Sequence, residues 1–282
     1  MPSGLARGKC PMVDAEPVLS DDDREAWERW QEVCAVHAQT KSFKRRVDSA
    51  VRAVDIALSR APNTMVSWSG GKDSTVMAHL VRVTAGIRLR VVSEKDDLDF
   101  PGEEEYVTRM AGEWDMDLEI VRPPVSPWEW FVANARGMAV GDDIHGRSSG
   151  MSKACFYNVM QSANESYDGV MMGLRSEESH ARARLRKARG RVYELRDGRV
   201  HSIPLADWSG LDVMSYAQLH GIELLPVYRC IGLMHADAPW TLRKSWWLPG
   251  ASAWFGQIAW LRRYYPSLHR RLLAVMPQSR MF

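Results

Sequence analysis

One short run of small, hydroxylated and charged residues has the composition of an anion-binding turn. It consists of Ser69, Gly70, Gly71, Lys72, Asp73 and Ser74. Paired glycines permit positive φ angles and close approach of the backbone to a ligand. If a helix begins here, its first amides are unpaired and its dipole favours an anion. Lys72 adds a full positive charge, two serine hydroxyls can donate, and Asp73 can cap the helix or help hold Mg²⁺.

The alternative is an ordinary tight turn capped by a serine or aspartate, which is what Gly-Gly usually indicates. An apolar run over 64–68 precedes this turn, and Val76, Leu80 and Val83 follow it at helical spacing. A strand before, a helix after and a lysine between favour phosphate binding. The run is not a Walker A loop, because the first glycine of that motif is absent.

Elements able to position this turn alternate along the chain. Expected strands cover 64–68, 87–92, 118–121 and 169–173. Expected helices cover 73–83, 103–114, 151–166, 176–187 and 209–220, and Asp197-Gly198 indicates a hairpin. Such alternation predicts an α/β fold with a doubly wound, mostly parallel sheet. Helices over 21–35 and 42–59 precede it as an N-terminal extension.

Composition divides the chain of 282 residues into four parts. We expect a disordered tail over 1–20, N-terminal helices over 21–60, a nucleotide-binding domain over 61–228 and a helical extension rich in Trp and Arg over 229–282. The tail has no apolar segment typical of a secretory signal. No apolar run approaches the ~20 residues that cross a bilayer. A formal net charge of only +2 does not by itself imply a polyanionic partner. Scattered cysteines are typical of reduced thiols in a cytosolic protein, so the chain is expected to be cytoplasmic, without a membrane partner.

The run from Ser69 to Ser74 resembles the PP-loop of the N-type ATP pyrophosphatases and phosphoadenosine phosphosulfate (PAPS) reductases. The segment Asp97-Leu98-Asp99-Phe100-Pro101-Gly102-Glu103-Glu104 is similar to the family's acidic segment beside the nucleotide, although the usual Asp-Thr-Gly is missing. The resemblance implies an adenine nucleotide alpha hydrolase-like, Rossmann-like fold. It also implies that Asp97 binds the nucleotide; the alternative is a solvated helix cap.

A second motif resembles the family's Gly-Leu-Arg-x-x-Glu-Ser-x-x-Arg. Here it comprises Gly173, Leu174, Arg175, Glu178, Ser179 and Arg182. Arg175 follows an expected buried strand and would lie at the carboxyl edge of the sheet, where α/β proteins bind ligands. Arg182, two turns into the expected helix, would supply a second guanidinium group that donates paired hydrogen bonds to a phosphate or sulfate. Glu178 would orient one arginine, and a surface salt-bridged helix is the alternative.

A third stretch, from Pro204 to Tyr228, resembles both the reductases and the small subunits of sulfate adenylyltransferases. The resemblance implies ATP, or the sulfonucleotides PAPS or APS, as substrate, with Mg²⁺. The favoured hypothesis is cleavage between the α and β phosphates to adenylylate an acceptor in sulfur metabolism or nucleic-acid modification. The alternatives are a sulfonucleotide reductase that uses Cys230, and a non-catalytic nucleotide sensor. Lys72, Asp73, Arg175 and Arg182 are the candidate catalytic residues.

Four scattered cysteines (Cys10, Cys34, Cys155 and Cys230) form no C-x-x-C pair. An iron–sulfur cluster needs about four thiolates, so none is expected. A dense basic stretch over 182–191 is either a solvated face or lid, or a contact for a phosphorylated or nucleic-acid acceptor. The terminal helices are candidate surfaces for a homo-oligomer or a partner protein.

Overall fold

The computed structural model describes residues 16–135, 138, 150–151, 154–155, 166–232, 241–242, 244, 247–248 and 256–281. A six-stranded sheet with the order β3-β2-β1-β4-β6-β5 forms its centre. The strands are β1 (Thr64–Ser67), β2 (Arg90–Glu94), β3 (Asp117–Val121), β4 (Gly169–Met172), β5 (Val192–Glu194) and β6 (Val200–Ser202). All neighbouring strands are parallel except β5, which pairs antiparallel with β6 as the expected hairpin.

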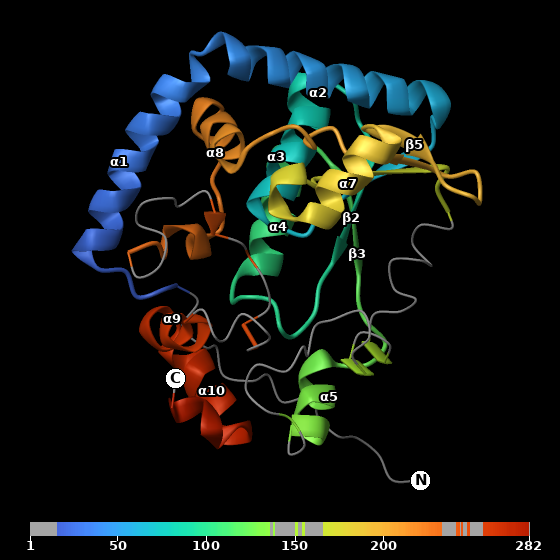
Figure 1. Cartoon of the computed structure of the whole chain (residues 1–282). Helices are drawn as coiled ribbons and strands as arrows, with labels where there is room; N and C mark the ends of the chain where they lie inside the picture. The colour runs from blue at the N-terminus through green and yellow to red at the C-terminus, as the bar shows by residue number, and fades with distance from the viewer. Residues whose placement is uncertain are drawn as a thin grey trace, which may run out of the picture.

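Helices surround the sheet (Figure 1). The α-helices are α1 (Asp21–Ala38), α2 (Lys41–Arg60), α3 (Lys72–His79), α4 (Glu103–Glu113), α5 (Pro127–Asn134), α7 (His180–Arg189), α8 (Gly210–Leu219), α9 (Gln257–Tyr264) and α10 (Pro266–Val275). Shorter helical turns are η1 (Leu80–Thr84), η4 (Ser176–Glu178), η5 (Pro226–Arg229) and η8 (Pro277–Met281). Figure 1 shows α1 and α2 along the outside of the molecule, with α9 and α10 together at the C-terminal end.

Alternating residues of the strands pack on opposite faces of the sheet. Val66 and Met171 belong to the main core, together with residues of α2, α3, α4 and α8. Their neighbours Met65 and Val170 belong to a separate cluster on the other face. Leu185 of α7 packs in a cluster that includes Met172 and so covers that second face. Helices on both faces of a mostly parallel sheet confirm the predicted doubly wound α/β class.

The order of the strands creates a switch point between β1 and β4. From β1 the chain proceeds to β2 and β3 on one side, and it then crosses to β4 on the other. Ligands of open α/β sheets bind at the carboxyl ends of strands where the order reverses in this way. The expected anion-binding turn leaves β1 there, and Arg175 leaves β4 beside it.

Several expected elements differ from the structure. The prediction of one helix over 176–187 is wrong, because the segment forms two helices, η4 and α7. They are separated by Ser179, which has an extended backbone and whose hydroxyl caps the start of α7. The strand expected over 87–92 lies over Arg90–Glu94, and the helix after the turn ends in a π-helical segment. Helix α5 was not expected, although Ser126 and Pro127 are typical of a helix start. The helix expected over 151–166 lies largely outside the described residues.

Buried Asp23 fixes the N-terminal extension to the C-terminal helices. Its carboxylate accepts hydrogen bonds from the Gly232 amide and the Tyr264 hydroxyl, both at 2.7 Å. It also completes the capping box of α1 with Ser20. The predicted tail lies mostly outside the described residues, but the Val18 amide donates to the Tyr264 carbonyl at 2.9 Å. These bonds join segments from the two ends of the chain.

Replacing Asp23 with Asn should destabilise the fold in a pH-dependent way. Burial alone would raise the pKa of Asp23, but hydrogen bonds from Ser20, Tyr264 and Gly232 lower it below its ordinary value. The stabilisation is therefore present above the unfolded pKa of about 3.9 and is lost as pH falls through the lower folded pKa. At neutral pH we expect a loss of about 1.5–3 kcal/mol, as for hydrogen bonds to a charged group.

Urea unfolding of Asp23→Asn and wild type at pH 7 and near pH 3 measures this effect. Asp22→Asn, an exposed change on the same helix turn, is the matched control and should alter stability little at either pH. An equal loss at both pH values would contradict the ionic account.

In the described part of the chain, no helix has the length and apolar character needed to cross a bilayer. Contacts also cross the predicted boundary between residues 228 and 229: the Lys72 ammonium group donates to the Leu242 carbonyl at 2.9 Å. The division of the chain into four parts stays a prediction.

Candidate nucleotide-binding site

The turn between β1 and α3 has the backbone geometry expected of an anion-binding loop. Gly70 has a φ of 81°, in the left-handed region that favours glycine. Gly71 is the N-cap of α3 and supplies no side-chain hydrogen bond to the helix start. The hydroxyls of Ser69 and Ser74 lie 3.0 Å apart, and Ser69 is exposed. An exposed hydroxyl therefore stands beside the first amides of α3.

Arg175 lies against this loop. Its Nε donates to Asp73 Oδ1, and one terminal nitrogen donates to Glu177. Glu177 in turn accepts from the Gly210 amide at 2.6 Å and so links the arginine to the start of α8. The Arg175 side chain is only 3% exposed. Two motifs about a hundred residues apart in sequence thus meet at the switch point.

Gly173 permits this approach. A Cβ atom at residue 173 would lie 2.8 Å from the carbonyl carbon and oxygen of Asp73 and from the Ser74 amide nitrogen. Such distances are too short for any side chain, and the atoms concerned are backbone. The glycine is needed because β4 and the start of α3 are in direct contact.

The Lys72 side chain is paired with oxygen atoms of the protein. Its ammonium group is buried and donates to Asp73 Oδ2 at 3.1 Å and to the Leu242 carbonyl at 2.9 Å. Its backbone amide donates to the Tyr228 hydroxyl at 2.8 Å. Burial raises the pKa of Tyr228, and the Asp73 carboxylate raises it further, so this hydroxyl stays protonated. One amide of the helix start is therefore already paired.

Two further lysines contact the loop. Lys95 follows β2, and Lys244 comes from the segment after η5; both ammonium groups donate to the Ser69 carbonyl, at 3.2 and 2.9 Å, and to Glu103. Lys244 also contacts Asp99 Oδ1 at 3.3 Å. Burial opposes the charge of Lys244, but Glu103 and Asp99 raise its pKa overall. The position of Lys95 directly after a strand parallel to β1 could indicate from the sequence that it lies near the loop. No sequence pattern indicates that Lys244 lies there.

The remaining predicted residues lie at the edge of this arrangement. Asp97 accepts from the hydroxyl of Ser126, the N-cap residue of α5, and from the Trp128 amide at 3.0 Å, so it supports the start of that helix. Glu178 accepts from the Arg175 amide at 3.3 Å and forms an ion pair with Arg182. Arg182 lies in the first turn of α7, not two turns into a helix. Direct binding roles for these residues stay predictions.

Two carboxyl groups at the carboxyl end of β2 have perturbed pKa values. Burial, and then the charge of Asp99, raise the pKa of Glu94 to about 7. The same causes, in the same order, raise the pKa of Asp96 to about 7. The carboxyl groups of Glu94 and Asp96 therefore exchange protons near neutral pH.

Asp73 fits poorly as a ligand of a resident metal ion. One of its carboxylate oxygens pairs with Lys72 and the other with Arg175. Mg²⁺ is held by carboxylate oxygens, phosphates and water. Among the described residues, no group of three or more His, Cys, Asp or Glu side chains could hold a metal ion. The described residues therefore do not fit a resident Mg²⁺.

The buried cysteines have no reactive character. Burial raises the pKa of Cys230, and its sulfur lies 3.9 Å from the Pro226 carbonyl. Burial also raises the pKa of Cys155, as do the charges of Asp97 and Asp96. Cys10 lies outside the described residues. A thiol that attacks as a thiolate needs a lowered pKa, which neither Cys155 nor Cys230 has.

Comparison with known proteins decides the family. The family model of the phosphoadenosine phosphosulfate reductase domain matches residues 63–234, more than half of the chain. The chain belongs to this family. The matched region contains both motifs that meet at the switch point, and it ends before Leu242 and Lys244.

Curated relatives of this PAPS reductase-domain protein include sulfate adenylyltransferase subunit 2 of Aliivibrio fischeri, 25% identical over 195 residues. That match covers 59% of this chain and 60% of the relative. The corresponding subunit of Vibrio parahaemolyticus is 26% identical over 197 residues, with the same coverage. The chain thus spans less than two thirds of the length of these relatives.

Solved structures similar to this family member include the PAPS reductase of Candida auris in a phosphate complex. That match has a TM-score of 0.48 and 16% identity, and it covers 74% of this chain and 90% of the other. The NMN synthetase of Francisella tularensis matches with a TM-score of 0.44 and 15% identity, over 65% of this chain and 73% of the other.

Proposed function

We propose that this PAPS reductase-domain protein is an enzyme that binds ATP and transfers its adenylyl group to an acceptor, in sulfur metabolism or nucleic-acid modification. The observation that carries the proposal is the meeting of two motifs at the switch point. The glycine turn after β1 and Arg175 after β4 lie together at the carboxyl edge of the sheet. The curated relatives named as sulfate adenylyltransferase subunits support adenylyl transfer rather than reduction.

The residues at this edge can perform such a transfer by positioning and by neutralising charge. An oxygen of the acceptor attacks the α-phosphorus, the bond from that phosphorus to the bridging oxygen of the β-phosphate breaks, and pyrophosphate leaves with those electrons. The loop amides and the Ser69 hydroxyl would hold the departing pyrophosphate. Arg175 would stabilise the charge that develops on it, which is the main catalytic contribution in phosphoryl chemistry.

The test is release of pyrophosphate from ATP. Protein supplied with ATP and Mg²⁺ is incubated with sulfate, or with a nucleic-acid acceptor, and pyrophosphate and the adenylylated product are measured. Acceptor-dependent release is the expected result. Tight ATP binding without turnover for any acceptor would instead favour the nucleotide sensor, and absence of ATP binding would reject the loop as a nucleotide site.

Replacement of Cys230 by Ser should leave adenylyl transfer unchanged. The thiol is fully buried with a raised pKa, so it makes no thiolate for attack on a sulfonucleotide. We expect only a loss of stability of about 1 kcal/mol from placing a hydroxyl in the core. Thermal unfolding and pyrophosphate release of Cys230→Ser measure the two effects.

The reductase hypothesis predicts the opposite for the same variant. It requires sulfite release from PAPS by the wild-type protein and its loss in Cys230→Ser. Cys34→Ser, another buried cysteine, is the matched control for the effect of a hydroxyl in the core. A partner subunit and Mg²⁺ as the counter-ion of ATP remain part of the proposal.

A further inference from the structure

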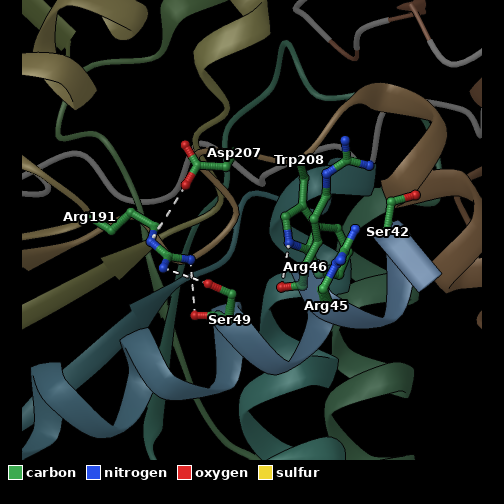
Figure 2. A pocket seen from close by; sticks show the side chains of 7 residues that line it. All are labelled: Ser42, Arg45, Arg46, Ser49, Arg191, Asp207 and Trp208. Carbon is green, nitrogen blue, oxygen red and sulfur yellow. Dashed lines mark hydrogen bonds and ion pairs between the residues drawn. The ribbon is translucent and has the colours of Figure 1, made fainter.

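A basic pocket lies at the same edge of the sheet as the nucleotide loop, beyond Arg175. It is a cavity of about 290 Å³. The lining residues are Ser42, Arg45, Arg46, Ser49, Arg191, Asp207 and Trp208. Figure 2 shows Arg191 and Asp207 near Ser49, whereas Ser42, Arg45 and Arg46 lie further along α2 on the side of Trp208. Small-molecule pockets begin at roughly 300 Å³, so this one suits a small polar group.

The sequence of α2 builds one wall of this pocket. Ser42, Arg45 and Ser49 recur at helical spacing and so share one face of the helix. Phe43, Ala50 and other residues on an adjoining face are buried in the core. The polar face is thus held in place by the packing of the apolar one.

The positive charge of the pocket is incompletely balanced. Asp207 is engaged by Arg186 of α7 through two bonds of 2.9 Å. Arg46 contacts the buried carboxylate of Asp212 at 2.8 Å. The exposed guanidinium of Arg45 has no hydrogen bond or ion pair in the part of the chain that the structure describes.

Arg191 lies opposite Arg45 and is itself fixed. Its terminal nitrogens donate to the carbonyl and hydroxyl of Ser49, at 3.0 and 2.6 Å. Burial lowers the pKa of Arg191; Asp207 raises it, and the like charges of Arg186 and Arg52 lower it. A positioned guanidinium among like charges is an electrostatic environment that favours an anion.

The pocket and the loop are connected through the sheet. Trp208 follows β6, which is parallel to β4, so the carboxyl ends of β1, β4 and β6 lie along one edge. Glu177 joins Arg175 to the Gly210 amide, close after Trp208. Neighbouring strands are about 4.8 Å apart, so β6 lies roughly 10 Å from β1 across two strand spacings.

From this arrangement we propose that the pocket between α2 and β5–β6 binds a phosphate ester group of the acceptor, with Arg45 as its principal contact. That the phosphate ester belongs to the acceptor rests on the proposed function. Binding of the ester in the pocket does not require ATP. Arginine forks match the oxygens of a phosphate group and donate two hydrogen bonds at once. The ester belongs either to a small phosphorylated metabolite or to a nucleic-acid backbone.

The experiment compares Arg45→Glu with Arg60→Glu in the full chain without ATP. Arg60 is also exposed, lies in the last turn of the same helix and does not line the pocket, so both variants have the same change in net charge. The probes are ribose 5-phosphate, a short single-stranded RNA, inorganic phosphate and uncharged ribose, titrated by calorimetry. Arg45→Glu should weaken binding of at least one ester about tenfold or more, equivalent to about 1.4 kcal/mol, while Arg60→Glu binds like wild type.

Each outcome either identifies the class of ligand or overturns the proposal. An effect on ribose 5-phosphate identifies a small phosphorylated acceptor, whereas an effect on RNA alone, steeply dependent on salt, identifies a nucleic acid. Equal binding by the two variants, or binding of inorganic phosphate without either ester, overturns the proposal. If phosphate binds at the loop between β1 and α3 instead, the two variants should have the same affinity for it. ATP binding by the wild-type protein tests the proposed function separately.

Discussion

Replacement of Gly173 by Ala should abolish tight ATP binding and destabilise the protein. The added Cβ would stand 2.8 Å from backbone atoms of Asp73 and Ser74, and neither β4 nor α3 can move without disturbing the core on both faces of the sheet. Overpacking of this kind costs typically about 1–3 kcal/mol. The displacement falls on the turn that we propose holds the phosphates, so affinity should fall along with stability.

Gly112→Ala is the matched control. Gly112 lies in α4, has no neighbour within 4 Å of an added Cβ and has no positive φ. The same change there should stabilise the helix by about 0.5–1 kcal/mol. Calorimetric titration with ATP and urea unfolding of both variants provide the measurements. Wild-type ATP affinity in Gly173→Ala would show that the contact between β4 and the loop is not part of the binding site.

Replacement of Arg175 by Ala should reduce pyrophosphate release about a hundredfold or more, the range reported for loss of a group that stabilises transition-state charge. The guanidinium is almost completely buried and contacts Asp73 and Glu177. Among the described residues, its removal leaves Lys72 as the ion-pair partner of Asp73, and it frees Glu177 from one of its partners. Arg175→Lys retains the charge but loses the planar fork, so it should recover only part of the rate.

Stability and turnover must be separated for this residue. Breaking a buried ion pair costs about 3–5 kcal/mol, so folding of each variant is checked by circular dichroism before kinetics are compared. Arg82→Ala, which removes a partly exposed ion pair with Asp115, is the control and should leave turnover unchanged. A folded Arg175→Ala with normal turnover would remove this residue from the catalytic role.

Local sequence signals predicted the loop, β1, β4 and the place of Arg175, because a strand, two glycines and a helix start are encoded within a few adjacent residues. They do not reveal which protein groups a side chain contacts when those partners are distant in sequence. The Asp97 carboxylate accepts from the Trp128 amide at the start of α5, a helix that begins with the typical Ser126-Pro127 pair. The direction of the Lys72 ammonium group depends on the Leu242 carbonyl, 170 residues away in sequence.

The contacts of Leu242 and Lys244 also bear on how the protein can be truncated. Both residues lie beyond position 234, where the match to the family ends. A fragment cut there would deprive the Lys72 ammonium of a carbonyl acceptor and leave Glu103 with one lysine instead of two. Recombinant versions that keep these contacts with the loop must therefore include the residues that follow the matched region.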